Sequence, residues 1–444
     1  MLSANETAEN YLSPYQDRLQ SASPFRVSGT VTEVTGLLIA SRGPWLPVGG
    51  VYQIHPVGGL RPMLAEVVGF RDEQTLLMPL GELRGIGPGS KVVALSKEAH
   101  LPLSEKLLGR VIDGLGRPLD GKAIVAAHSY PIYAANLNPL DREEICQPLD
   151  VGIRAINALI TCGKGQRVAI MAGSGVGKST LLSMIARNTR ADVKIIALIG
   201  ERGREVEDFV ARTLPPDERD RMIVVAATSE APALVRVRGA FVATTIAEYF
   251  RDRGQDVLLL MDSLSRFAMA QREAGLTAGE PPSTKGYTPS VFALLPRLIE
   301  RAGNWKAKGS ITALYTVLLE GDDPHEPIAD AARSLTDGHI QLSRRLAEQA
   351  HYPAIDVLSS VSRVRTKVTS QEHQRLVDEA TRLMAAFRDA EDLIQIGAYT
   401  RGKNAEVDRA VELMPRLREF LRQQAAQDAK LETSFLALAE LLAV

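Results

Sequence analysis

The sequence has little cysteine, almost no net charge and no long hydrophobic run, and each shortage excludes a class of protein. Two cysteines, Cys146 and Cys162, are too few for the disulfide framework of a small secreted domain. The 52 Lys and Arg residues balance 53 Asp and Glu residues, so the chain as a whole does not attract nucleic acid or an anionic membrane. No apolar run approaches the roughly 18 residues that a membrane-spanning helix needs.

Metal-ligand spacing and a secretory signal are missing as well. The seven histidines are scattered, so no structural metal is expected. Glu6 and Glu9 stand where a secretory signal would be basic and then apolar, and we therefore expect a cytoplasmic protein. The 444 residues, 45% of them hydrophobic, are enough for about two to three domains with buried cores.

The residue pattern changes twice in the first third of the chain. Residues 1–24 are polar, and their apolar positions suit one face of a short helix, which favours a partner-binding segment and a frayed terminus equally. Residues 25–97 consist of short alternating or β-branched runs separated by Gly and Pro, which predicts a small β-barrel domain. Residues 98–149 form a linker in which Gly and Pro favour tight turns over regular elements.

The sequence after residue 149 predicts an α/β domain followed by a helical domain. Residues 150–367 alternate helix-like segments with apolar runs, which is typical of a parallel sheet covered by helices on both faces. The apolar runs are 193–199, 222–227, 257–261 and 311–318. Residues 368–444 carry apolar side chains at helical spacing, such as Leu376 and Leu383, and predict a C-terminal helical domain.

A glycine-rich loop after the apolar run 167–171 gives the strongest functional signal. Its residues are Gly173, Ser174, Gly175, Val176, Gly177, Lys178, Ser179 and Thr180, and an apolar helix-like segment follows. A strand, such a loop and a helix in this order form a nucleotide phosphate-binding loop, or P-loop, in which backbone N–H groups and Lys178 hold phosphates and the Ser179 hydroxyl can bind Mg²⁺. The formal motif has glycine where Ala172 stands, but the strand and helix on either side favour a P-loop over a chance helix cap.

Hydrolysis of a triphosphate needs a second metal anchor, a base and a cation, and the sequence offers a candidate for each. Asp262 ends the apolar run 257–261, so a parallel sheet would place it beside the P-loop. Glu201 follows another such run, and we expect it to act as a base toward water, with Arg202 close enough to touch the γ-phosphate. A helix cap at Asp262 and a solvated charge cluster around Glu201 are the alternatives.

The segment 351–363 carries a recognisable pattern, with Pro-Ala-Ile-Asp followed by paired serines and an arginine. Together with the P-loop, Gly-Glu-Arg-Gly-Arg-Glu-Val at 200–206, Leu-Leu-Leu-Met-Asp-Ser at 258–263 and Gly-Glu-Pro-Pro at 279–282, it resembles the α/β subunits of rotary ATPases. Over about residues 25–400 the chain is similar to the type III secretion ATPases. The segments 138–142, 189–193 and 397–399 resemble the flagellar export ATPases most, with the virulence injectisome ATPases as the close alternative.

This resemblance implies a fold and a set of roles. The fold is an N-terminal β-barrel, a RecA-like P-loop core and a C-terminal helical domain, assembled as a homo-hexamer that hydrolyses Mg²⁺-ATP. Matching the motifs position by position makes Lys178 the phosphate lysine, Ser179 and Asp262 the Mg²⁺ residues, and Glu201 the catalytic glutamate. Arg363 matches an arginine finger offered to a neighbouring subunit, Tyr352 matches the aromatic residue on adenine, and Tyr399 is expected to complete that pocket.

The resemblance also implies partners. A stator-like regulatory protein is expected to bind residues 1–20, within the N-terminal segment, where Pro14 interrupts the helical pattern. The C-terminal helices are expected to face the export gate and chaperone–substrate complexes, which places a cytoplasmic protein peripherally at the inner-membrane export apparatus.

Two other functions share these motifs. In rotary ion-translocating ATPases the catalytic glutamate and the trans-acting arginine are divided between two chains, whereas Glu201 and Arg363 lie in one chain here, which favours a homo-oligomer. An RNA translocase would present a basic, aromatic platform, but residues 25–95 contain few Lys or aromatic residues, so no nucleic-acid partner is expected. A nucleotide sensor without activity is disfavoured because Glu201 is present.

Overall fold

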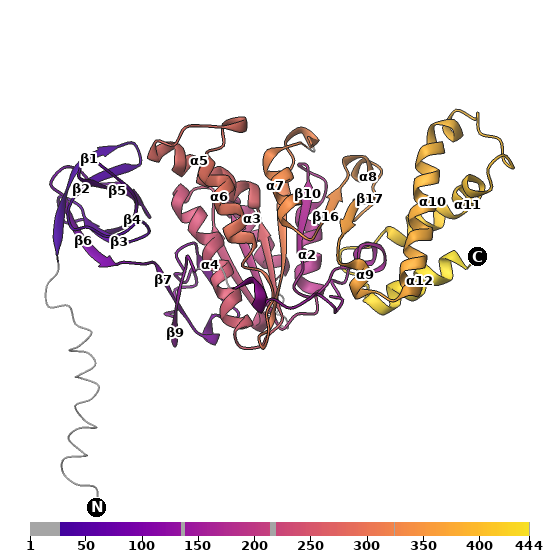
Figure 1. The fold of residues 1–444 in the computed structure, drawn as a ribbon, viewed down its shortest axis with the longest axis horizontal. Coiled ribbons are helices and arrows are strands. Elements are labelled where there is room, and N and C mark those ends of the chain that lie inside the picture. The colour runs from indigo at the N-terminus through magenta and orange to yellow at the C-terminus, as the bar shows by residue number, and fades with distance from the viewer. Residues whose placement is uncertain (1–26, 135–137, 214–218, 324, 444) are drawn as a thin grey trace, which may run out of the picture. The chain divides into compact units, whose positions relative to one another are not determined.

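The computed structural model describes residues 27–134, 138–213, 219–323 and 325–443 (Figure 1). The predicted N-terminal partner-binding segment, residues 1–24, lies outside the described residues. The chain divides into two compact units, residues 1–99 and 100–444.

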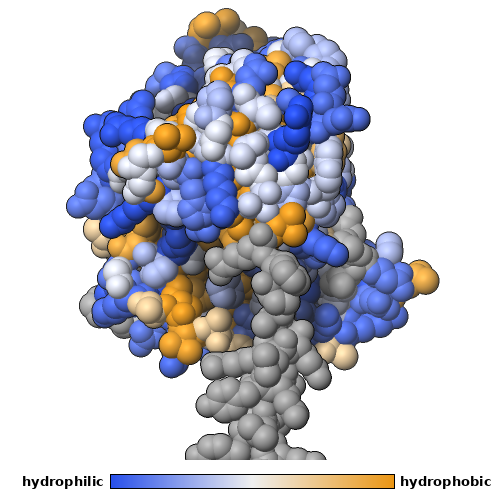
Figure 2. All heavy atoms as spheres, turned by 90° about the vertical axis from the view of Figure 1, so that its left-hand side faces the viewer, coloured by the Kyte–Doolittle hydropathy of each residue, from blue (hydrophilic) through white to orange (hydrophobic). Residues whose placement is uncertain are grey.

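The first unit is a closed barrel of six strands, as the alternating runs predict. The strands are β1 (Ser28–Thr35), β2 (Leu38–Arg42), β3 (Val51–His55), β4 (Met63–Arg71), β5 (Gln74–Pro79) and β6 (Lys91–Ser96). They pair in the order β1-β2-β5-β4-β3-β6, and fully buried Ile39, Tyr52 and Leu77 are part of the interior core. In Figure 2, which views the molecule from the left-hand side of Figure 1, hydrophobic side chains are interspersed with hydrophilic and neutral ones.

The second unit is built on a nine-stranded sheet, which confirms the α/β prediction. Its strands are β8 (Val111–Asp113), β10 (Arg167–Ala172), β11 (Val193–Ile199), β12 (Met222–Ala227), β13 (Val257–Asp262), β14 (Gly303–Asn304), β15 (Ser310–Leu318), β16 (Gly338–Leu342) and β17 (Ile355–Ser362). The order is β17-β16-β10-β15-β13-β11-β12-β8, with β14 on β15. All pairs are parallel except β14 with β15 and β16 with β17, so the carboxyl ends of β10, β11 and β13 meet at one edge.

Helices connect and cover these strands. They are α2 (Lys178–Asn188), α3 (Gly203–Thr213), α4 (Ala233–Arg251), α5 (Leu264–Ala278), α6 (Pro289–Ile299), α7 (Pro327–Leu335), α8 (Arg344–Glu348) and α9 (Arg365–Val368). Short turns of helix lie at Glu105–Leu107, Pro139–Asp141, Ile156–Ile160, Arg219–Arg221, Thr284–Gly286 and Glu320–Asp322. Helix α4 packs on β11, β12 and β13, and nearly all of its residues are buried.

The segment after residue 97 contains more regular structure than its turn signals predict. Strand β8 lies within it and adds a parallel edge to β12, and β7 (His100–Leu103) pairs with β9 (His128–Pro131) as a separate ribbon. Val111 and Ile112 are β-branched, a residue type enriched in strands, and Ile112 is fully buried where β8 joins the sheet. A strand of three residues is too short for its periodicity to be recognised in the sequence.

The chain ends in the helices that the apolar spacing predicts: α10 (Gln371–Gln395), α11 (Ala405–Leu421) and α12 (Leu431–Leu442). Ser370 caps α10 by accepting a hydrogen bond from the backbone N–H of His373. The three helices contact one another, and Leu383, Leu417 and Leu438 join the same buried core as the sheet. In the described part of the chain, no helix combines the length and apolarity needed to cross a bilayer.

Candidate functional site

The predicted P-loop leaves the carboxyl end of β10, and α2 begins at Lys178. Gly175 and Gly177 have φ values of +78° and +89°, which glycine adopts without strain. A Cβ atom on Gly177 would lie 3.3 Å from the Cε1 atom of Tyr352, so a larger residue would also crowd this ring. The free N–H groups of the first turn of α2 and its dipole make this loop an anion-binding site.

Three charged side chains from separate strand ends meet at the loop. The ammonium of Lys178 donates a short hydrogen bond to Oδ1 of Asp262 and lies 3.7 Å from Oε1 of Glu201. Glu201 follows β11 and Asp262 ends β13, which is the meeting of strand ends that the sequence predicts. Their side chains are 12% and 6% exposed, so these charges interact in a poorly solvated place.

Glu201 has the acidity of a proton acceptor near neutral pH. Burial raises its pKa to about 7, the negative charge of Asp262 adds to this rise, and the positive charge of Lys178 opposes it. A carboxylate whose pKa lies close to the working pH can take a proton from water and release it again. This supports the predicted role of Glu201 over a solvated charge.

A cavity of about 210 Å³ contains the groups that would hold a magnesium ion. Ser179, Glu201 and Asp262 line it, together with Glu205 and Asp208 of α3. Mg²⁺ prefers oxygen ligands and is usually held by one or two protein groups plus substrate phosphates. The Ser179 hydroxyl and the Asp262 carboxylate fit that requirement, and among the described residues no group of three or more His, Cys, Asp or Glu could hold a metal alone.

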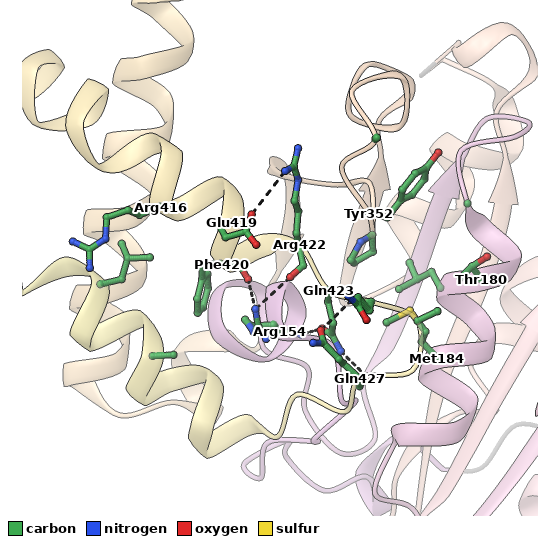
Figure 3. A pocket seen from close by; sticks show the side chains of 18 of the residues that line it. Arg154, Thr180, Met184, Tyr352, Arg416, Glu419, Phe420, Arg422, Gln423 and Gln427 are labelled. Carbon is green, nitrogen blue, oxygen red and sulfur yellow. Dashed lines mark hydrogen bonds and ion pairs between the residues drawn. The ribbon is translucent and has the colours of Figure 1, made fainter.

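A larger cavity of about 1070 Å³ shares the loop with the first. Gly175, Gly177 and Thr180 line it from the P-loop and α2, and Tyr352 lines it from the segment before β17. Figure 3 shows Tyr352 and Thr180 on one side of this cavity and residues of the C-terminal region, such as Phe420, on the other. Tyr352 is 46% exposed, so part of this aromatic side chain is open to a ligand in the cavity.

Two residues that contact the site, Thr316 and Gln423, belong to no motif that the sequence alone reveals. The Thr316 hydroxyl donates a 2.6 Å hydrogen bond to Asp262 and so fixes its orientation. Gln423, which is buried, donates its backbone N–H to the carbonyl of Tyr352 at 2.9 Å, while its side chain bonds the backbone of Gly152 and Arg154. Tertiary packing alone places Thr316 against Asp262 and Gln423 at the larger cavity.

Two predicted arginines lie outside both cavities of their own chain. Arg202 is exposed, and its guanidinium lies 3.9 Å from the Glu205 carboxylate. Arg363, at the end of β17, is exposed and donates a 3.2 Å hydrogen bond to the carbonyl of Arg333. Its contact with a phosphate therefore stays a prediction about a neighbouring subunit.

Tyr399 does not line the larger cavity of its own chain, and its part in an adenine pocket stays a prediction. Its hydroxyl donates a 2.8 Å hydrogen bond to Asp408 in the first turn of α11. Phe420, near the other end of α11, is the aromatic residue from the C-terminal region that lines the cavity. Seventeen helical residues span about 25 Å, so the length of α11 keeps Tyr399 away from this place.

Three family models cover most of the chain. The β-barrel domain of the ATP synthase alpha/beta family matches residues 26–96, and its nucleotide-binding domain matches residues 152–362. The C-terminal domain of the EscN ATPase of type III secretion systems matches residues 369–440. The P-loop, Glu201, Asp262 and Tyr352 all lie within the nucleotide-binding match.

Individual relatives agree with these models. The flagellum-specific ATP synthase of Bacillus subtilis is 48% identical over 428 residues, which are 96% of this chain and 97% of that protein. The SPI-2 type 3 secretion system ATPase of Salmonella typhimurium is 50% identical over 398 residues, 89% of this chain and 90% of that protein.

A solved structure extends the likeness to three dimensions. The assembled ATPase EscN from the type III secretion system of enteropathogenic E. coli matches with a TM-score of 0.89 at 44% identity. The match covers 93% of this chain and all of that chain. The chain therefore belongs to the ATP synthase alpha/beta family, among the flagellar and type III secretion ATPases.

Proposed function

We propose that this chain hydrolyses Mg²⁺-ATP as a ring of six identical subunits and thereby drives type III protein export, most directly that of flagellar components. The observation that carries this proposal is the meeting of Lys178, Glu201 and Asp262 at the P-loop. The flagellum-specific relatives support the flagellar assignment, because two of them are 48% identical over 96% and 97% of this chain, whereas a type 3 secretion system ATPase that also covers 96% is 45% identical.

In the proposed reaction, the P-loop N–H groups, the start of α2 and Lys178 hold the phosphates. Glu201 takes the proton of the attacking water, since its raised pKa keeps it a usable base near neutral pH. Ser179 and Asp262 would hold Mg²⁺, which supplies charge stabilisation at the phosphoryl oxygens. Tyr352 packs on the adenine in the larger cavity.

Arg363 completes the site of the adjacent subunit. An exposed guanidinium outside both cavities of its own chain is free to reach another copy, where it would neutralise charge that develops in the transition state. The EscN structures support an assembled state, and one of them contains EscN in complex with its central stalk EscO. We propose a comparable stalk partner for this chain.

The remaining contacts belong to the same proposal. The N-terminal segment binds a stator-like regulatory protein, and the C-terminal helices face the export gate and chaperone–substrate complexes. The protein then acts at the cytoplasmic side of the inner membrane as a peripheral component.

ATP turnover measured against protein concentration tests the ring. Specific activity should rise steeply as rings form, and a flat profile would contradict the assembly. Deletion of the gene in the native organism should abolish flagellar filaments, while any secretion through an injectisome continues. Loss of injectisome secretion with intact filaments would instead assign the chain to the injectisome.

A further inference from the structure

An ion pair outside both nucleotide cavities holds the first half of the P-loop. Arg344 is the first residue of α8, and Asp322 ends the helical turn after β15. The Arg344 guanidinium donates to both carboxylate oxygens of Asp322, at 2.5 and 3.3 Å. Its Nη2 atom also donates to the carbonyl oxygen of Ser174, at 3.1 Å. The fixed fork of an arginine suits this arrangement, because one rigid group meets acceptors on two segments.

The pair lies directly against the loop backbone. A Cβ atom on Gly173 would lie 1.9 Å from Oδ1 of Asp322 and 3.0 Å from Nη2 of Arg344. The Arg344 and Asp322 side chains are 46% and 42% exposed, so the pair contributes little to the free energy of unfolding. Its effect is local and falls on the peptide that follows Ser174.

That peptide carries a group expected to bind phosphate. The carbonyl of Ser174 and the N–H of Gly175 belong to one planar trans peptide, so they point in opposite directions. Gly175 lines the large nucleotide cavity, whereas Arg344 and Asp322 line a different cavity. Because Arg344 holds the carbonyl on its own side, the N–H of Gly175 is directed away from Arg344.

We infer that Arg344 and Asp322 are positioning residues that orient the Gly175 N–H toward the phosphates of the nucleotide. The inference rests on the proposed ATPase function and adds two residues that never touch the substrate. Loss of the Arg344 fork frees the Ser174–Gly175 peptide to rotate, which weakens phosphate binding in the ground state and the transition state alike.

The neighbouring arginine provides a matched control. Arg345 lies on the same short helix and pairs with Glu391 of α10, so it faces the C-terminal helices instead of the P-loop. Arg345→Ala therefore removes an arginine and an ion pair from α8 without touching Ser174. Arg344→Lys keeps the charge but loses the fork, and Asp322→Asn keeps an acceptor but loses the charge that orients the fork.

The experiment measures KM, kcat and the direct affinity for ATP in the full chain, with thermal melting for each variant. Arg344→Ala should raise KM about tenfold, the loss expected for one partly exposed hydrogen bond to a charged donor, while kcat falls less than about threefold. Asp322→Asn and Arg344→Lys should each raise KM about threefold. Arg345→Ala should leave KM within about twofold of the original value.

Two outcomes would overturn the inference. One is the same KM for Arg344→Ala and Arg345→Ala. The other is a set of variants in which kcat falls in proportion to the melting temperature while KM is unchanged. A residue with a purely structural role would give that result, because its loss reduces the fraction of folded protein and not the affinity for ATP. If the unaltered protein bound ATP without turnover, the proposed function would fail, and the ratio of ATP affinities would still decide the role of Arg344.

Discussion

The two cavities that share the P-loop are built in different ways. The smaller one is lined by Ser179, Glu201 and Asp262, residues from the loop and from the ends of neighbouring strands. The larger one gathers residues from α2, from the segment before β17 and from the C-terminal helices. The proposed chemistry therefore depends on groups at the strand ends of the sheet, while the proposed place for the adenine depends on how a separate group of helices packs.

This difference predicts different kinetic effects. Changes in the smaller cavity should lower kcat and leave nucleotide affinity nearly intact, because they act on groups whose interactions strengthen in the transition state. Changes in the larger cavity should lower affinity and base selectivity and leave kcat nearly intact. Variants in each cavity test this division, and a variant of Arg363, which lies outside both cavities of its own chain, tests the contribution of the neighbouring subunit.

Arg363→Ala should produce the largest loss, about 10³- to 10⁵-fold in kcat, as arginine fingers do in other phosphoryl-transfer enzymes. Steady-state turnover measures it. Mixing Arg363→Ala with Glu201→Gln subunits should restore part of the activity, because some interfaces then combine an intact Glu201 site with an intact Arg363 from the next copy. Arg365→Ala, which breaks an exposed pair with Asp378, is the control and should change kcat less than about twofold. Co-assembled mixtures that stay inactive would place Arg363 in its own subunit's chemistry.

Glu201→Gln should lower kcat about 10²- to 10⁴-fold while ATP still binds, because the amide keeps the shape of the side chain but cannot accept a proton. Isothermal titration with ATP separates binding from turnover. Lys178→Ala is the contrasting variant and should abolish binding, since it removes a cation from the phosphates. Near-normal turnover in Glu201→Gln would make Glu205, which lines the same cavity, the next candidate base.

Asp262→Asn should raise the Mg²⁺ concentration needed for half-maximal activity about tenfold, because a charged ligand is replaced by a neutral amide of the same size. A magnesium titration of activity measures this shift. The variant also weakens the pairing with Lys178, so a melting curve must accompany it to separate metal affinity from unfolding. An unchanged Mg²⁺ titration would show that Asp262 does not bind the metal.

The smaller cavity could be predicted from the sequence because its parts obey local rules. The order of strand, loop and helix identifies the P-loop, and parallel pairing brings the ends of β11 and β13 to the same edge. Glu201 and Asp262 follow from those two facts alone. Thr316 does not, since a threonine inside a buried strand carries no sign that its hydroxyl meets Asp262.

The larger cavity could be predicted only in part. Tyr352 is predicted from the resemblance of its segment to known ATPases, and the role of Tyr399, which does not line this cavity in its own chain, stays a prediction. Phe420 and Gln423 reach the cavity because α11 and the segment after it pack against the core. Such packing depends on many weak contacts across the sequence, which no single motif records.

Tyr352→Ala should weaken ATP affinity about tenfold with kcat changed less than about twofold, since loss of a stacked ring costs roughly 1–3 kcal/mol. Tyr352→Phe is the matched control and should bind almost as the original protein does, because it keeps the ring. Competition between ATP and GTP measures base selectivity, which should fall in the alanine variant alone. A fall in kcat without a loss of affinity would break the division between the two cavities.

Gln423→Ala should have the smallest effect, about a threefold loss of ATP affinity. The backbone hydrogen bond from residue 423 to Tyr352 survives the change, but the side chain no longer bonds Gly152 and Arg154. The Gly152 carbonyl and the Arg154 N–H then lose a buried partner, which costs about 1–3 kcal/mol locally and loosens the segment that supports Tyr352. Gln395→Ala, at the exposed end of α10, is the control, and fluorescent-nucleotide titration measures both. Equal affinity in the two variants would mean that the larger cavity keeps its shape without this contact, and that Tyr352 is held by its own segment.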